Sequence, residues 1–376
     1  MSSVDVTRRN IVKGSFLTTV AATVTASGGV LAQDVCNANV SKKQRPTLVA
    51  PPLKKGDTIG FFSPSTPATS FAFKRFERAK AFLSTKGFKL QAGSLTGQSD
   101  HYRSGSIKDR VDELNSLIHD PNVRCIMSTI GGMVSNSMLP YIDYEALRKD
   151  PKIIVGYSDV TAILFAIYSQ TGLITYYGPA LVASFGEMGY FLNQTYQYFN
   201  DVVEQPNFPY QITNPEFWTE DYVDWQKQSA VKSKNKNSLV TLNNGQASGR
   251  LIAGNLNTIS GIWGSKYMPE INQGDILLIE DSFIDAATVE RSFSHLKLCG
   301  VFDRIGGLII GKHEKFDDKG SGKKHYEILM EVIGKPTCPI LAEYDCSHTH
   351  PMITLPIGSR VLLDATKQHL TILSIT

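Results

Sequence analysis

The run Lys152-Ile153-Ile154-Val155-Gly156-Tyr157-Ser158-Asp159-Val160-Thr161 decides the fold, because it joins a strand to a helix through one short corner. Its first half is apolar and β-branched, which is typical of a strand buried on both faces. The chain then turns at Gly156, and a helix is expected to begin near Asp159. Strands of this kind occur in parallel sheets covered by helices, so the run predicts an α/β fold.

The same alternation of strand and helix precedes this run. Residues 58–62 and 123–127 are short apolar stretches that read as buried strands, and residues 72–83 place apolar side chains at helical spacing. Ser106 with Asp109 forms a capping box that is expected to start another helix. A doubly wound, mostly parallel sheet is therefore predicted.

The length of 376 residues, 42% of them hydrophobic, exceeds what one core usually organises, so two domains are expected. We assign residues 50–180 to the doubly wound N-terminal domain and residues 181–245 to a connector with a surface loop. Residues 246–376 form a smaller, β-rich α/β domain in this prediction. It contains a strand at 276–279 and a helix at 286–298.

Charge and cysteine usage exclude several classes of protein. The net charge of +3 comes from interspersed acids and bases, so no basic footprint for nucleic acid is present, and a small ligand is the expected partner. The five cysteines show no C-x-x-C pair, and neither a metal nor another cofactor is predicted. Cys338 and Cys346 are a candidate disulfide pair if the protein reaches an oxidising compartment.

Residues 1–35 have the pattern of an export signal. A basic head containing Arg8-Arg9 precedes a mildly apolar run at 16–32 that ends in small residues. The paired arginines indicate the twin-arginine route and a periplasmic protein, whereas an unstructured tail is the alternative. The apolar run is short and diluted by hydroxyl groups, so no stable membrane span is expected.

Two loops are candidates for an active site, one with a nucleophile and one with donors for an oxyanion. Ser158 lies at a strand-to-helix corner, where the following backbone N–H groups could stabilise an oxyanion, although the local sequence alone favours a serine that caps the helix. Gly131-Gly132 follows the predicted strand at 123–127, so it is expected at the same sheet edge, either as an oxyanion-binding loop or as an ordinary turn.

Acids and histidines follow later strands. Glu280-Asp281 comes directly after the apolar run 276–279, where a carboxylate either caps a helix or orients a catalytic group. His348 and His350 lie in a predicted loop, and histidine is the usual general base near neutral pH. No further ligand spacing supports a metal site at the His-x-His pair.

These segments together resemble the LD-carboxypeptidase family of serine peptidases, including its branch of microcin-C-immunity type. The similarity extends from about residue 51 to the C-terminus. The runs that carry it are 102–106, 131–132 with Asn136, 139–144, 156–161, 254–256, 278–281, 347–352 and 356–358.

The resemblance implies a role for each matching residue. Ser158 is similar to the family's nucleophile, His348 to its general base, and Glu280 to the acid that orients the histidine. The backbone N–H groups of Gly132 and Asp159 correspond to the oxyanion hole. The family also implies an active site in the cleft between two domains, and a homodimer.

Three further residues are candidate substrate contacts by the same resemblance. Trp218 and Trp225 lie where the immunity branch carries a ring-stacking tryptophan, and Met133 stands where the family often has tyrosine. The leading hypothesis is an LD-carboxypeptidase that removes a terminal D-amino acid from murein peptides. The alternatives are an amidase of microcin-C-immunity type that acts on aminoacyl nucleotide analogues, and a non-catalytic periplasmic peptide-binding protein.

Overall fold

The computed structural model describes residues 45–228 and 230–375. The export signal predicted at residues 1–35 lies outside the described residues. Within the described part of the chain, no helix combines the length and the apolar character needed to cross a bilayer.

The first sheet has six strands in the order β14-β5-β4-β3-β1-β2. All neighbours from β2 to β5 pair in parallel, which confirms the predicted parallel sheet, and β14 pairs antiparallel with β5. Its strands are β1 (Thr58–Phe62), β2 (Lys89–Ala92), β3 (Val123–Ser128), β4 (Ile153–Gly156), β5 (Thr175–Tyr177) and β14 (Leu355–Ile357).

Helices cover this sheet, with α3 packed on β1 and β3, and α5 on β4 and β5. Their bounds are α1 (Ala68–Phe71), α2 (Phe73–Thr85), α3 (Ile107–His119), α4 (Tyr144–Lys149) and α5 (Thr161–Thr171). The predicted capping box at α3 is confirmed: Ser106 Oγ accepts from Asp109 N, and the Asp109 carboxylate accepts from Ser106 N.

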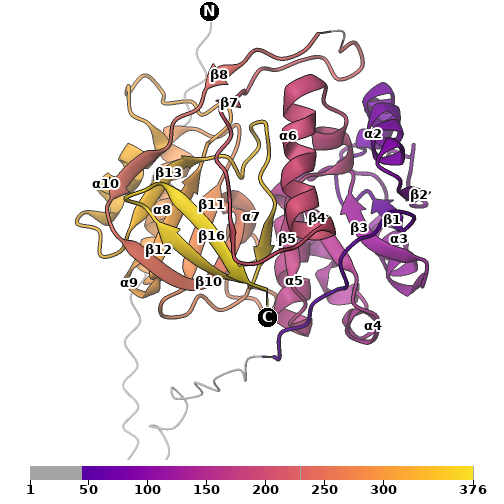
Figure 1. Cartoon of the computed structure of the whole chain (residues 1–376), viewed down its shortest axis with the longest axis horizontal. Coiled ribbons are helices and arrows are strands. Elements are labelled where there is room, and N and C mark those ends of the chain that lie inside the picture. The colour runs from indigo at the N-terminus through magenta and orange to yellow at the C-terminus, as the bar shows by residue number, and fades with distance from the viewer. Residues whose placement is uncertain (1–44, 229, 376) are drawn as a thin grey trace, which may run out of the picture. The chain divides into compact units, whose positions relative to one another are not determined.

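The second sheet has eight strands in the order β6-β16-β15-β10-β11-β12-β13-β9, parallel from β10 to β13 and antiparallel elsewhere. Its strands are β6 (Tyr210–Gln211), β9 (Val240–Asn243), β10 (Gln246–Asn255), β11 (Ile276–Glu280), β12 (Gly307–Gly311), β13 (Ile340–Tyr344), β15 (Arg360–Asp364) and β16 (His369–Ser374). The helices of this half are α7 (Leu256–Ser260), α8 (Ala286–Leu298), α9 (Val301–Arg304) and α10 (His325–Ile333). Figure 1 shows the two sheets side by side, the first in indigo to magenta and the second mainly in orange to yellow.

The stretch 181–245 is more structured than a connector. It forms α6 (Gly189–Phe199), the edge strands β6 and β9 of the second sheet, and β7 (Phe217–Trp218), which pairs with β8 (Asn235–Lys236). The buried residues of α6 recur at helical spacing, but they are aromatic and hydroxyl side chains of low helix propensity. Packing rather than propensity therefore accounts for this helix.

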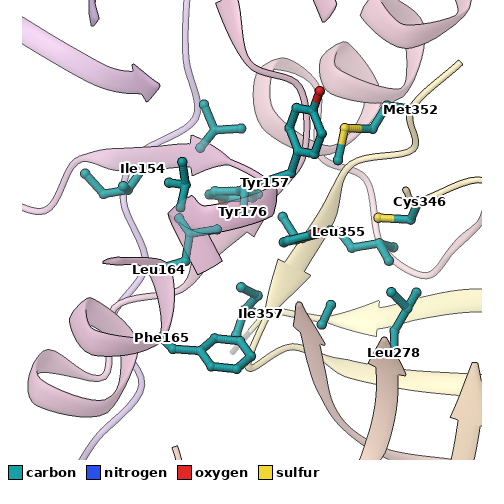
Figure 2. Close-up of a cluster of buried hydrophobic side chains, with 14 of the residues drawn as sticks. Ile154, Tyr157, Leu164, Phe165, Tyr176, Leu278, Cys346, Met352, Leu355 and Ile357 are labelled. Atoms are coloured by element: carbon teal, nitrogen blue, oxygen red, sulfur yellow. The ribbon is translucent and has the colours of Figure 1, made fainter. Parts of the chain in front are cut away.

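One hydrophobic core runs through both halves. Figure 2 shows Ile154, Leu164 and Phe165 of the first half in one cluster of buried side chains with Leu278 of the second half. The backbones also approach closely, since a Cβ at Gly254 would lie 2.6 Å from Thr161 Cγ2. The serine-bearing and histidine-bearing halves are thus packed as one body.

The predicted disulfide between Cys338 and Cys346 is wrong: all four described cysteines are free. The two residues lie on either side of β13, and an extended strand of that length spans on the order of 15 Å. A disulfide requires Cα atoms within about 7 Å. Cys346 instead packs as an apolar side chain in the core between the halves (Figure 2).

Candidate active site

Ser158 occupies a strained corner at the carboxyl end of β4. Its φ of +61° is in the left-handed region that non-glycine residues rarely adopt. A 3₁₀ turn (Ser158–Val160) follows directly and leads into α5, and no side chain caps either element. The alternative that Ser158 serves as a helix cap is therefore not what the structure shows. Strain of this kind at a sheet edge is typical of functional residues.

The glycine loop predicted as an oxyanion hole lies against this serine. A Cβ at Gly131 would lie 2.8 Å from Ser158 Cβ and 3.1 Å from both Ser158 Oγ and Asp159 N. Within the described residues, the backbone N–H groups of Gly132 and Asp159 donate no hydrogen bond. Two free donors beside a serine are suited to a negatively charged oxygen.

The Asp159 side chain fixes the glycine loop to the serine corner. Its Oδ2 accepts hydrogen bonds from Val134 N at 3.1 Å and Ser135 N at 3.0 Å, and Ser135 Oγ donates to the Asp159 carbonyl at 2.6 Å. Ser65 Oγ accepts from Met133 N and Val134 N on the other side of the loop. Burial raises the pKa of Asp159, partly offset by these hydrogen bonds. Asp159 therefore provides a backbone N–H donor next to the serine, and its side chain holds the glycine loop in place.

Glu280 and His348 form a buried pair across the second half. Glu280 ends β11 with no exposed surface, and its Oε2 lies 2.7 Å from His348 Nδ1. A carboxylate only accepts hydrogen bonds, so Nδ1 carries the proton and Nε2 is left as the basic nitrogen. Burial alone would lower the pKa of His348, but the Glu280 carboxylate outweighs it and raises that pKa above its ordinary value. The imidazole is thereby oriented and made more basic.

Tyr177 connects this pair to the serine, a link that the sequence did not reveal. Its hydroxyl donates to Glu280 Oε1 at 2.5 Å and accepts from Ser158 N at 3.2 Å. Burial holds the pKa of Tyr177 well above its usual range, so the hydroxyl keeps its proton. Asn255 Nδ2 adds a second hydrogen bond to the same Glu280 oxygen at 3.1 Å. A tyrosine at the end of β5 was the available signal, because β5 neighbours β4 at the same edge.

A pocket of about 550 Å³ lies over these residues, with Ser158, His348, Gly131 and Gly132 in its wall. No hydrogen bond joins Ser158 Oγ to the His348 ring within the described chain. Such contacts are often long in ligand-free sites and shorten when substrate binds. The serine corner, the glycine loop and the histidine loop that the sequence singled out thus line one cavity, and Glu280 lies buried next to His348 outside its wall.

The three candidate substrate contacts are placed differently. Trp225 lines the pocket, with the Arg75 guanidinium 4.7 Å from its ring centroid and Phe71 stacked at 6.1 Å. Trp218 lies in β7 under the Lys312 ammonium, outside the pocket wall. Met133 is 79% exposed and is also outside that wall. Sequence reasoning missed the exposed aromatic side chains of the pocket wall, which are Phe71, Tyr222 and Phe283.

His350 also lines the pocket, but it forms no hydrogen bond or ion pair with Glu280 among the described residues. Its Nε2 lies 3.7 Å from Glu187 Oε2, and burial holds its pKa well below the ordinary value. Among the described residues, no group of three or more histidine, cysteine, aspartate and glutamate side chains could hold a metal ion.

Comparison with known proteins places these features in a family. Residues 59–178 match the model of the LD-carboxypeptidase N-terminal domain, and residues 248–363 match that of the LD-carboxypeptidase C-terminal domain. A putative carboxypeptidase of Vibrio cholerae is 57% identical over 84% of this chain and 95% of its own length. A probable murein peptide carboxypeptidase of Bacillus subtilis is 27% identical over 84% of this chain and 91% of its own.

The microcin C7 self-immunity protein MccF of Escherichia coli is 51% identical over 86% of this chain and 95% of its own. A solved structure of MccF in complex with aspartyl sulfamoyl adenosine superimposes with a TM-score of 0.85, covering 87% of this chain and 98% of that one.

Proposed function

The chain belongs to the LD-carboxypeptidase family, and on that basis we propose a serine-type amide hydrolase in which Ser158, His348 and Glu280 form the catalytic triad. The observation that carries the proposal is the hydrogen-bonded chain from Ser158 N through Tyr177 and Glu280 to His348 Nδ1. The matching family models and several of the relatives are named carboxypeptidases, so a hydrolase is supported over a non-catalytic peptide-binding protein.

In the proposed reaction, His348 Nε2 removes the Ser158 hydroxyl proton as Oγ forms a bond to the substrate carbonyl carbon. The negative charge on the former carbonyl oxygen is stabilised by the N–H groups of Gly132 and Asp159. The carbon–nitrogen bond then breaks as His348 returns the proton to the leaving nitrogen. Water attacks the acylated serine by the same route and releases the acid.

For the substrate, we propose first an aminoacyl compound with an aromatic leaving group, of the type that MccF binds, and second a murein tetrapeptide. This reverses the order expected from the sequence alone. It rests on the higher identity to MccF than to the murein peptide carboxypeptidase, and on Trp225 in the pocket wall. An aromatic side chain such as Trp225 can stack on a nucleobase of any kind.

A substrate panel tests this order. The protein is incubated with aspartyl sulfamoyl adenosine and with murein tetrapeptide, and products are separated by liquid chromatography. Trp225→Ala is expected to lower kcat/KM on the adenosine compound about 10- to 100-fold, because one stacking contact is lost. Trp218→Ala, outside the pocket wall, is the matched control and should change it by less than about threefold. Turnover of the tetrapeptide alone would reverse the order again.

The pH profile of the reaction should depend on Glu280. His348 is active as a base when neutral, so kcat/KM rises with pH, with its midpoint above the ordinary histidine value because Glu280 raises that pKa. Glu280→Gln removes the charge that stabilises the imidazolium, so the midpoint should move to lower pH while the plateau falls.

The control for this profile is Asp281→Asn, because Asp281 is the neighbouring acid but forms no hydrogen bond with His348. Burial raises the pKa of Asp281 to about 6. It should move the midpoint less than Glu280→Gln does. Equal midpoints in wild type and Glu280→Gln would remove Glu280 from its proposed role.

We also propose export by the twin-arginine route, on the pattern at residues 1–35, and a homodimer, on the family resemblance. Fractionation of cells carrying the wild type or Arg8→Lys/Arg9→Lys would test export. Recovery of both the wild type and the variant in the periplasm would contradict the twin-arginine route. A monomer in sedimentation of the purified protein would contradict the homodimer.

A further inference from the structure

Glu314 lies beside the triad at the end of a neighbouring strand. It follows β12, which pairs in parallel with β11, the strand that ends at Glu280. Phe283 N donates to the Glu314 carbonyl at 2.8 Å, which fixes this segment next to the residues after Glu280. The Glu314 side chain is part of the pocket wall together with Ser158 and His348.

The Glu314 carboxylate makes no hydrogen bond or ion pair with any described residue, although it is only partly exposed. The other acids of the pocket wall have partners: Glu220 accepts from Lys315 N at 2.8 Å, and Asp221 accepts from Ser233 N at 2.8 Å. Asp224 accepts from two backbone N–H groups of its own turn. Glu314 is thus the wall carboxylate whose acceptors are vacant in the described structure.

The cations of the pocket wall are already paired. Lys232 Nζ lies 3.2 Å from Glu187, and Lys315 Nζ lies 3.8 Å from Glu220. His348 is held by Glu280. The positive charges of Lys232 and His348 act on the Glu314 carboxylate, but neither group forms an ion pair with it, and burial raises the pKa of Glu314. A carboxylate that is partly buried and has no direct partner favours a cation supplied by the ligand, since a buried charge without a hydrogen-bonded partner is costly.

We propose that Glu314 binds a primary ammonium group of the substrate on the acyl side of the scissile amide. This inference rests on the proposed function and names what the same site recognises. An aminoacyl compound carries its α-ammonium there, and the diamino residue of a murein peptide carries the ammonium of its far centre. The leaving groups carry no cation, and a terminal D-alanine carries a carboxylate that Glu314 would repel. The acyl side is therefore the one that its charge fits.

Binding to the Ser158→Ala protein separates this inference from turnover. Calorimetric titration would compare aspartyl sulfamoyl adenosine with its succinyl counterpart, which lacks the α-amine, and murein tetrapeptide with the same peptide acetylated on the free amine of its diamino residue. If the two members of one ligand pair differ in affinity, the ammonium group that distinguishes them is the one that the protein binds.

Adding Glu314→Gln should reduce the ratio of affinities for the amine and its matched derivative about 10- to 100-fold, as expected for a hydrogen-bonded charge pair. Adding Glu220→Gln, a wall acid that already has a partner, should leave that ratio within about threefold. Circular dichroism confirms that each variant is folded.

An unchanged ratio in Glu314→Gln, or no difference between amine and derivative in either pair, would overturn the inference. Failure of the Ser158-containing protein to cleave either compound would instead contradict the proposed function. The two results are read from different proteins and different measurements, so each can fail alone.

Discussion

Ser158→Ala is expected to lower kcat/KM by about 10⁴-fold or more while leaving the fold intact. The hydroxyl is the proposed attacking group, and the backbone donors next to it can still bind the substrate without it. Its Oγ makes no hydrogen bond within the described chain, so removing it breaks no contact of the folded state. The measurement is turnover of whichever substrate the wild type cleaves, with thermal unfolding followed in parallel.

Ser282→Ala is the matched control, because Ser282 is another serine in the pocket wall. It should stay within about threefold of the wild type. Retained activity in Ser158→Ala would exclude the serine mechanism, and loss in both variants would indicate a general disturbance of the pocket.

His348→Ala should lower kcat by about 10³-fold or more, because it removes both the base and the acid of the cycle. The loss should concern kcat more than KM, since the ring acts on protons rather than on substrate binding. Added imidazole is expected to restore part of the rate by occupying the space next to Glu280.

His350→Ala is the comparison for this variant, since His350 lines the same pocket two residues later. It lies 3.7 Å from Glu187 and has no hydrogen bond to Glu280, so its loss should cost less than about tenfold. An inactive His350→Ala beside an active His348→Ala would show that the base was assigned to the wrong histidine.

The strands of the fold could be predicted where their apolar runs are uninterrupted. Residues 153–155 and 276–279 lie in buried strands at the centre of the two sheets, and burial on both faces demands that pattern. Helix α6 was missed because its buried face mixes aromatic and hydroxyl side chains, a composition that resembles a loop. These residues are Phe191, Thr195, Tyr198 and Phe199. The edge strands β6 and β9 are short and partly exposed, so little hydrophobic periodicity marks them.

Each candidate residue of the site could be proposed from the sequence, but the hydrogen bonds that connect these residues could not. Ser158 and His348 each follow a strand and Glu280 ends one, and the family resemblance implied a role for each of them. Tyr177 lies 103 residues before Glu280, so its hydrogen bond to that carboxylate depends on how the two sheets pack. Trp218 and Trp225 are similar in the sequence, and only the path of their loop separates the one in the pocket wall from the one under Lys312.

Strand β14 has a consequence for how the triad is aligned. It follows His348 along the chain, yet it belongs to the sheet of the nucleophile, where Leu355 pairs with Tyr177. Rotating one half away from the other would break this ladder and expose the shared core. The register of this ladder, together with the shared core, therefore sets how the proposed base and nucleophile lie relative to each other once the chain has folded. Little of the substrate's binding energy then goes into bringing the catalytic groups together, which leaves it available for selecting the ligand.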